Sequence, residues 1–497
     1  MRNYALLIAL IFSASLSFAQ FIQRKEALAD LKEFKTSLEK QSSYFQLSDF
    51  DFESRYKQIE RKIVKQDSIP IYYLAYELEK IIAETIDRHA NIRMDDLEEE
   101  DFELFSLHFP FSLAYLDGKV VALKESKTSK GYEYYLDQYH FLKSINGKSI
   151  DDFLERYAYR RKHSPDQARL TDGLRDLRDI GELCFKQGEL DIKKVNIVLT
   201  DGKRDKNLTL PLSNKKNRWW DVGSLRYSDA WMSFIRGRDY DFDKLDRWLT
   251  DSIGYLALPA MISYEEYSTF EPYLKATMEK YRNAKALIFD IRGNSGGTRE
   301  ILSTLSGYII QPMQSPWVAN VAYVRSDQNL DEDISSMQRR FLYNYDSDFL
   351  SDVDRKSIDD FNSSYETEYK FDIKKFSSPF YMVLHGNSSP LTCPIYILVN
   401  EECFSAASVF ASAFKGLPKV KLVGVNTNGS SGRSQNFHLV NSNIRVRLST
   451  MLSFQRNGKT LDGNGTVPDI VLERSEAQVL GKKDTQLEQL IELIQKK

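Results

Sequence analysis

The sequence has few cysteines, and the three that it has, Cys184, Cys393 and Cys403, stand far apart or among apolar neighbours. Three cysteines cannot make a disulfide framework, and at most one bridge can form. We expect all three to be small core residues. Because cysteines and histidines do not cluster at the spacing of metal ligands, the sequence calls for neither a metal nor a cofactor.

The sequence also lacks an excess of positive or negative charge. The chain has 68 Lys and Arg against 71 Asp and Glu, a formal net charge of -3, and no long run of either sign. Without a basic face the protein is a poor partner for nucleic acid, which we exclude. A length of 497 residues with 42% hydrophobic residues is typical of a globular protein of roughly two to four domains.

Long apolar runs are missing after residue 20, where no stretch approaches the roughly 20 residues that cross a bilayer. A shorter apolar run lies before residue 20, between Tyr4 and Leu16. It follows Arg2, and Ser17-Phe18-Ala19 comes after it. This pattern predicts a signal peptide over residues 1–19, with a buried N-terminal helix as the alternative. No cysteine follows the cut, which argues against a lipid anchor. We expect an exported, soluble product, periplasmic or extracellular.

The periodicity of apolar residues changes along the chain. Over 20–100 it is helical three times, at 26–40, at 52–63 and after Pro70, which predicts a helical N-terminal cap. Over 101–215, Asp117-Gly118 separates two apolar runs, and Asn146-Gly147 precedes a short helix at 150–156, so this part is β-rich. Its order of strand, turn and helix resembles a PDZ-like module, although many mixed domains share that order.

The remaining chain, 216–475, alternates strands and helices. Strands are expected at 253–258, 286–290, 394–399 and 420–424, and helices at 265–281, 299–308 and 405–415. Such βαβ units predict a mixed α/β fold whose core follows the cap and the β-rich insert. Residues 326–378 are polar and poorly periodic, which indicates an insertion or lid. A C-terminal helix is expected over 476–497.

A glycine-rich loop, DIRGNSGG at 290–297, joins a predicted strand to a predicted helix. Gly296 and Gly297 can expose N–H groups at the helix N-terminus, where the helix dipole favours negative charge. The loop suits an oxyanion or a phosphate, and a tight turn without a ligand is the alternative. It is not a Walker loop, because no Gly-Lys-Ser/Thr follows.

Ser405 stands where the strand at 394–399 turns into the helix at 405–415. A serine there can lift its hydroxyl out of the sheet while the N–H of Ala406 is free to bind an oxyanion. Serine is also a common N-cap. On local grounds, both interpretations stay open.

Four motifs, in order, resemble those of the C-terminal processing peptidases and the tricorn core protease. DIRGNSGG resembles Asp-Leu-Arg-x-Asn-x-Gly-Gly, and NEECFSAAS at 400–408 resembles the nucleophile motif Asn-x-x-Thr-x-Ser-Ala-x-Glu. VGVNTNG at 423–429 and DGNGTVPDI at 462–470 resemble Gly-x-x-Thr-x-Gly and Glu-Gly-x-Gly-Val-x-Pro-Asp-Ile. The resemblance covers about 250–325 and 380–472. It implies a serine peptidase with Ser405 as nucleophile and an oxyanion hole made by Ala406 with Gly296 or Gly297.

The resemblance also bears on the general base. The processing peptidases use a Lys just after the Thr-x-Gly stretch, but here that position is Ser430 and residues 422–440 contain no Lys. The tricorn-like branch draws a His from the helical part, and IDRHA at 86–90 resembles that element, which implies His89 as base. A rate that rises through the imidazole range is then expected. His438, in an alternating strand-like segment, is the competing histidine.

Three positions depart from the family pattern. Arg88 replaces a small residue, Ser408 replaces a Glu, and Asp462 replaces a Glu that supports the base directly or through an intermediary. Two functions therefore remain. One is a peptidase acting on peptides or unfolded protein tails bound as an added strand. The other is a non-catalytic peptide- or lipophilic-ligand-binding protein, as in retinoid-binding relatives. The retained Ser405, His89 and glycine pair favour catalysis, and the sequence predicts no oligomeric state.

Overall fold

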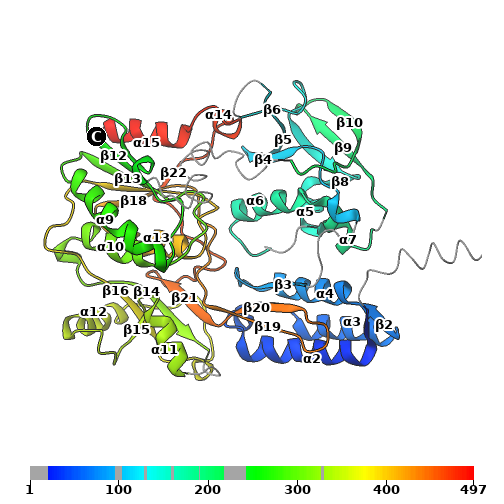
Figure 1. The fold of residues 1–497 in the computed structure, drawn as a ribbon, viewed down its shortest axis with the longest axis horizontal. Coiled ribbons are helices and arrows are strands. Elements are labelled where there is room, and N and C mark those ends of the chain that lie inside the picture. The colour runs from blue at the N-terminus through cyan, green and yellow to red at the C-terminus, as the bar shows by residue number, and fades with distance from the viewer. Residues whose placement is uncertain are drawn as a thin grey trace, which may run out of the picture.

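The computed structural model describes residues 21–95, 103–127, 131–157, 162–189, 191–217, 242–325 and 330–496. The predicted signal peptide, 1–19, lies outside these residues. The described chain forms two bodies side by side (Figure 1). One contains the segments before residue 217 together with a long hairpin, β19–β20, and the other contains most of the chain after residue 242. Among the described helices, none has the length and apolarity needed to cross a membrane.

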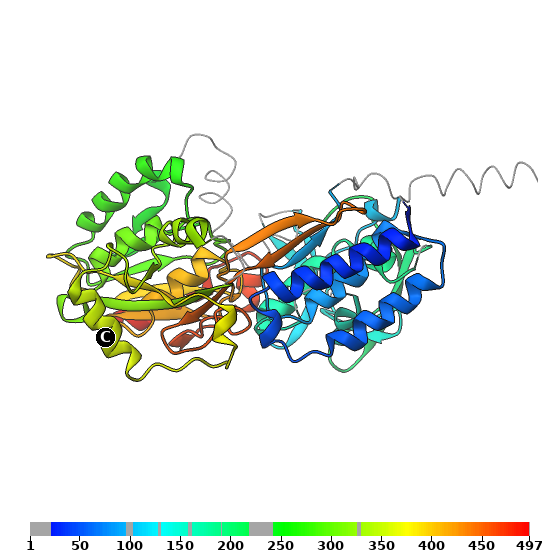
Figure 2. The same cartoon turned by 90° about the horizontal axis from the view of Figure 1, so that it is seen from below.

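The first 73 described residues, 21–93, form a helical layer that contains all three predicted helices. Its elements are β1 (Phe21–Gln23), α2 (Arg24–Gln41), η1 (Phe45–Leu47), α3 (Phe52–Val64), β2 (Ser68–Pro70), α4 (Ile71–Ala83) and β3 (Asn91–Arg93). The apolar stripes of the helices pack together, with Leu31 and Phe34 fully buried. Val446 and Leu448 join the same core. They come from β20 (Arg445–Ser449), which pairs with both β3 and β19 (Ser434–His438). Figure 2 shows this orange hairpin reaching across to the blue helices.

The β-rich part builds a seven-stranded sheet with its own core. Its elements are η3 (Glu103–Ser106), β4 (Ser112–Leu116), β5 (Lys119–Glu125), β6 (Tyr132–Tyr134), β7 (Phe141–Ile145), β8 (Lys148–Ser149), α5 (Ile150–Tyr157), α6 (Asp166–Leu177), α7 (Ile180–Lys186), β9 (Lys194–Thr200) and β10 (Asp205–Pro211). Asp117-Gly118 and Asn146-Gly147 both take positive φ, the geometry of tight hairpin turns, so the predicted hairpin and turn are confirmed.

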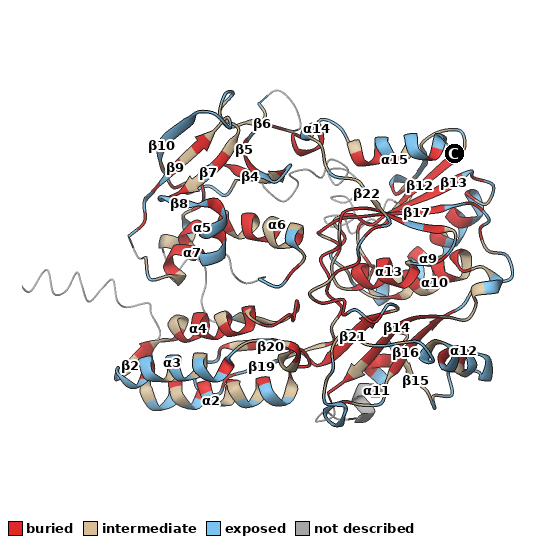
Figure 3. Ribbon diagram, turned by 180° about the vertical axis from the view of Figure 1, so that it is seen from behind, coloured by how far each residue is buried: buried red, intermediate tan, exposed pale blue. Residues whose placement is uncertain are grey.

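A six-stranded sheet carries the predicted βαβ units, in the order β11-β12-β13-β17-β18-β22. Its elements and helices are η6 (Phe242–Lys244), β11 (Asp246–Trp248), β12 (Ile253–Ala257), α9 (Tyr264–Lys280), β13 (Ala286–Asp290), α10 (Glu300–Ile309), β17 (Ile395–Val399), α13 (Ala406–Phe414), β18 (Val420–Gly424) and β22 (Ile470–Val471). Within this sheet, the five strands β12, β13, β17, β18 and β22 run parallel. Parallel strands buried on both faces are apolar throughout, and most of this sheet is red in Figure 3. Because β13 and β17 are neighbours, the loops that follow them meet at one edge of the sheet.

A second, antiparallel sheet packs in the same body, in the order β15-β16-β14-β21. It contains η7 (Pro312–Gln314), β14 (Trp317–Val324), α11 (Leu330–Gln338), β15 (Tyr343–Asn344), α12 (Asp352–Asn362), η8 (Ile373–Lys375), β16 (Phe380–Leu384) and β21 (Met451–Gln455). Much of the polar segment expected at 326–378 is therefore helical or paired. Ile358 of α12 packs against Val321 and Tyr381 of the sheet.

The expected C-terminal helix over 476–497 is two helices instead. They are α14 (Glu476–Val479) and α15 (Thr485–Gln495). The break has a local cause, because Gly481 adopts φ 74° and Asp484 caps α15 by accepting a hydrogen bond from the Leu487 N–H. Leu487, Leu490 and Ile494 of α15 pack on the six-stranded sheet.

The three cysteines are free and buried, as the sequence predicts for core residues.

Candidate active site

Ser405 ends the loop between β17 and α13. It holds the N-cap position of α13, yet its side chain makes no capping hydrogen bond. Its backbone lies at φ 53° and ψ -124°, a conformation that L-residues rarely adopt and that stores strain. Its N–H donates to Ser430 Oγ at 2.8 Å. The strained junction leaves the hydroxyl free of the helix start.

His89 reaches that hydroxyl from the helical layer. It lies in the turn between α4 and β3, and its Nε2 is 3.4 Å from Ser405 Oγ, although the two residues are 316 positions apart. The ring packs on Phe404, with centroids 4.9 Å apart, and His89 is only 6% exposed. The structure therefore brings together the nucleophile and the base that the motifs imply, one from each body.

The Asp87 carboxylate fixes the backbone of the His89 turn. It accepts from the N–H groups of His89 and Ala90 at 2.9 and 3.1 Å. It also accepts from the Ser449 hydroxyl and N–H at 2.6 and 2.8 Å, at the end of β20. Burial raises the pKa of Asp87 despite these bonds. The position of His89 thus depends on the β19–β20 hairpin.

The surroundings of His89 disfavour its charged form. Burial and the nearby charges of Arg447, Arg88 and Arg340 lower the pKa of His89 to about 3. Its Nδ1 is buried and has no hydrogen-bond partner among the described residues. A neutral imidazole offers Nε2 as a proton acceptor over the whole physiological range. The lowered pKa moves the protonation of His89 below the ordinary imidazole range.

Asp462 acts on the main chain beside His89 and makes no hydrogen bond to the imidazole within the described chain. Its Oδ1 accepts from the Arg88 N–H at 3.0 Å. Its Oδ2 accepts from the Tyr44 hydroxyl at 2.8 Å and the Ser431 N–H at 3.1 Å. Burial, and next the charge of Asp87, raise the pKa of Asp462 to about 7. Its contact with the His89 segment is made through the backbone of residue 88, and its role in supporting the base stays a prediction.

The glycine loop lies directly against Ser405. A Cβ on Gly296 would stand 2.6 Å from Ser405 Cβ and 2.9 Å from the Ala406 nitrogen, so no larger residue fits there. The Gly296 N–H donates to Asn294 Oδ1 at 2.8 Å and is already used. The Gly297 N–H makes no hydrogen bond within the described chain, and Ala406 is the first residue of α13, where an N–H lacks a helical acceptor. Of the two glycine N–H groups, Gly297 has the unused one.

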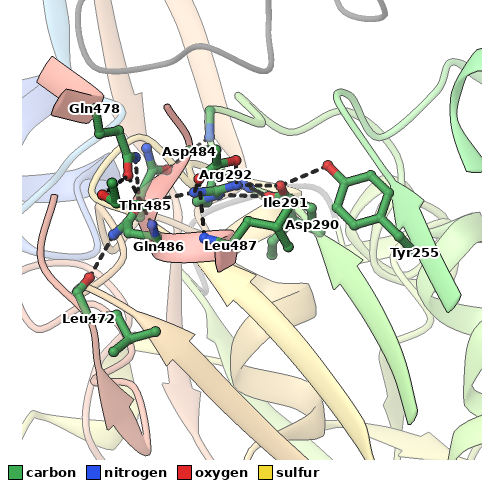
Figure 4. A network of polar contacts seen from close by, with 12 residues as sticks. Tyr255, Asp290, Ile291, Arg292, Leu472, Gln478, Asp484, Thr485, Gln486 and Leu487 are labelled. Atoms are coloured by element: carbon green, nitrogen blue, oxygen red, sulfur yellow. Dashed lines mark hydrogen bonds and ion pairs between the residues drawn. The ribbon is translucent and has the colours of Figure 1, made fainter. Parts of the chain in front are cut away.

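The Asp-x-Arg part of the loop has a structural role. Figure 4 shows Arg292 between Asp290 of its own loop and Asp484 at the start of α15. The guanidinium binds each carboxylate through two hydrogen bonds of 2.6–3.0 Å and also donates to Gln486. Burial opposes the charge of Arg292, but the two carboxylates hold its pKa above the ordinary range. This network fastens the glycine loop to the C-terminal helix.

The positions that depart from the family pattern are occupied without blocking Ser405. The Arg88 guanidinium binds Asp172 of α6 at 3.2 Å and Asn428 at 2.6 Å. Ser408 donates to the Cys403 carbonyl at 2.7 Å, within the loop that carries Ser405. Ser430, at the position of the missing Lys, binds the Ser405 backbone.

The competing histidine, His438, lies exposed on β19 with its Nε2 3.4 Å from Asp95. Ring nitrogens of three other histidines also lie near acidic or carbonyl oxygens, at His108–Asp179, His140–Asp137 and His385–Asp354. Among the described histidines, only His89 is within hydrogen-bond reach of Ser405.

A pocket of about 330 Å³ opens beside Ser405. It is lined by residues of the glycine loop, α11 and the start of α13, among them Gly297, Arg299, Arg339, Arg340, Ser405 and Ala406. Neither the role of these arginines nor the contact between Ser430 and Ser405 could be predicted from the sequence. None of them belongs to a recognisable motif, although the replacement of the family Lys by Ser430 marked that position as unusual.

Residues 252–472 match the model of peptidase family S41. Among solved structures the chain is similar to mature CPAF (TM-score 0.62), to mature CPAF complexed with lactacystin (0.61) and to a serine-to-alanine mutant of CPAF (0.64). Each is 15% identical, and each match covers 95% of this chain and 97–99% of the other. At that identity the likeness shows the fold. No curated protein matches the sequence.

The family match includes the five parallel strands of the six-stranded sheet, the glycine loop, the loop that carries Ser405 and the Asp462 segment. It confirms the family that the four motifs indicate. Residues 252–472 therefore match peptidase family S41, and this match identifies the chain as a serine-type peptidase.

Proposed function

We propose that this peptidase cleaves peptide bonds through an acyl-enzyme on Ser405, with His89 as the general base. The observation that carries the proposal is the 3.4 Å approach of His89 Nε2 to a serine hydroxyl held on a strained strand-to-helix junction. Ser405 Oγ attacks the substrate carbonyl while its proton passes to His89 Nε2. His89 then gives the proton to the leaving amine, and water, with the same base, releases the acyl group.

The oxyanion of each tetrahedral intermediate lies, in this proposal, between the N–H groups of Gly297 and Ala406. Both are unused at the mouth of the pocket, and Ala406 adds the positive end of the α13 dipole. The arginines that lower the pKa of His89 also favour negative charge beside it. That field offsets the low basicity of His89, because the imidazolium and the oxyanion form together.

Substrates are peptides or protein segments. We propose further that the enzyme meets them outside the cytoplasm, because the first 19 residues have the composition and the small-residue cut of a signal peptide. Both an endopeptidase and a tail-specific activity fit a site at the carboxyl ends of β13 and β17, beside the pocket that contains Ser405.

The test compares two serines of one helix. Ser405→Ala should remove all peptide hydrolysis from a mixed peptide panel, with an unchanged circular dichroism spectrum. Ser412→Ala is the matched control, because the buried Ser412 hydroxyl has no hydrogen-bond partner among the described residues. It should retain the activity of the parent. Hydrolysis by Ser405→Ala at the parental rate would overturn the assignment.

A further inference from the structure

The pocket beside Ser405 is strongly basic in a protein whose net charge is -3. Its charged lining residues are Arg299, Arg339 and Arg340, and no acidic residue lines it among the described side chains. Arg299 follows the glycine loop, and Arg339 and Arg340 follow helix α11. Two different parts of the chain thus direct positive charge at one small space next to the nucleophile.

Arg299 is the deepest of the three, only 5% exposed. Its Nη1 donates to the Arg340 carbonyl at 3.1 Å, and it has no ion pair within the described chain. Burial, and next the charge of Arg340, lower the pKa of Arg299 to about 9. The neighbouring Glu300 makes no ion pair with Arg299 among the described residues, although its charge opposes the lowering of the Arg299 pKa.

Arg340 is half-buried and donates from Nη1 to the Ser336 carbonyl and hydroxyl, at 2.8 and 2.9 Å. Burial and the charge of Arg433 lower the pKa of Arg340. Arg339 is exposed at the rim, and like Arg340 it has no ion pair in the described part of the chain. A buried charge without a counter-charge, such as that of Arg299, is costly, and groups of this kind cluster at functional sites.

We propose that this pocket binds a carboxylate of the substrate next to the scissile bond, so that the enzyme prefers peptides with an acidic group there. The inference rests on the proposed function, because it takes Ser405 as the nucleophile. A carboxylate fits the planar donor forks of arginine through paired hydrogen bonds. Two sources share this chemistry, the side chain of Asp or Glu flanking the bond and the free C-terminus of the peptide.

The experiment uses the full chain and matched fluorogenic peptides. Members of each pair differ only by Glu against Gln at one position flanking the cleaved bond, and each is made with a free and with an amidated C-terminus. The acidic member should have a kcat/KM about ten- to a hundredfold higher than the neutral member. This ratio corresponds to the free energy that charged hydrogen bonds contribute. If the preference follows the free C-terminus instead, the pocket still binds carboxylate and its source is the terminus.

Variants connect the preference to the pocket. Arg339→Gln and Arg340→Gln should each reduce the ratio of acidic to neutral kcat/KM, and Arg339→Glu should reduce it most. The matched control is Arg61→Gln, an exposed arginine in the last turn of α3. It should leave the ratio unchanged.

Two failures are distinguishable. If peptides are cleaved through Ser405 but the acidic and neutral members, free and amidated, have equal kcat/KM, the carboxylate pocket is wrong while the proposed function stands. If no peptide is cleaved and Ser405 takes no fluorophosphonate label, the proposed function fails, and the inference fails with it.

Discussion

At residue 405 the backbone holds an angle pair that suits glycine better than any L-residue. If that strain is maintained for catalysis, relieving it should stabilise the fold. We predict that Ser405→Gly is more stable than Ser405→Ala by about 1 kcal/mol in urea unfolding, since only the alanine keeps a Cβ in the strained region. Equal or lower stability of the glycine variant would mean that the junction stores no strain.

The burial of His89 makes the stability of the fold depend on pH. The pKa of His89 falls from 6.5 to about 3 on folding, so the folded state binds fewer protons than the unfolded state between those values. The stability from burying neutral His89 is present in full above pH 6.5 and is lost as pH falls toward 3. His89→Gln should remove this dependence, which is about 1.4 kcal/mol per pH unit. Urea titrations of both proteins between pH 6.5 and 4 measure it, and identical slopes would contradict it.

The approach of His89 to Ser405 could be predicted because each stands in a short motif of one family pattern, whereas their catalytic roles stay a proposal. The role of Asp462 could be predicted only as a pair of alternatives, since a motif gives a residue but not the direction of its side chain. The assignment of the oxyanion donor to Gly297, and not Gly296, depends on the hydrogen bond from the Gly296 N–H to Asn294. The basic pocket depends on the contact of two segments that are distant in the sequence. No sequence motif predicts either feature.

Among the elements, α15 is joined to the active-site loop through Arg292 (Figure 4). Asp484→Asn removes one charge from this buried network but keeps a good helix cap. We predict a loss of about 2 kcal/mol in unfolding free energy, because Arg292 is left with less compensation. Slower peptide hydrolysis should accompany it, since Arg292 anchors the loop that carries Gly297.

The control for that prediction is Glu488→Gln on the same helix, whose carboxylate is half exposed and 3.8 Å from Lys483. It should cost less than about 0.5 kcal/mol. If Asp484→Asn is no more harmful than Glu488→Gln, the network does not hold α15.

The strands and helices that sequence periodicity found are those with long apolar patterns, such as β13, β17 and α13. The second sheet was missed because its pairings are remote. Strand β14 pairs with β21, more than 120 positions later, and β15 has two residues. The segment at 326–378 has weak periodicity in part because its helix α12 buries only Asp354 and Ile358.

At the scale of the whole molecule, the active site is assembled between two bodies (Figures 1 and 2). Ser405 comes from the α/β body and His89 from the helical layer, and the β19–β20 hairpin crosses between them. Further contacts join the bodies near the site, including Tyr44 with Asp462 and Arg88 with Asn428. Catalytic geometry is therefore a property of the assembled fold.

Export is the prediction that concerns the whole chain. Expressed from its own start codon in a bacterial host, the protein should be cut near residue 19, so that the mature form begins close to Gln20. The described structure begins at Phe21, whose strand β1 pairs with β2, so removal of the preceding residues leaves this pairing intact. N-terminal sequencing of the periplasmic or secreted fraction checks this. An intact Met1 on the folded protein would contradict it.

The most direct test of the account is to locate a fluorophosphonate adduct by mass spectrometry, with its rate of formation measured in the parent and in His89→Ala. We predict one adduct, on Ser405, formed at least about a hundredfold more slowly without His89, since general-base activation of the nucleophile contributes that much or more. An adduct on another serine, or a rate unchanged in His89→Ala, would contradict the Ser405–His89 mechanism.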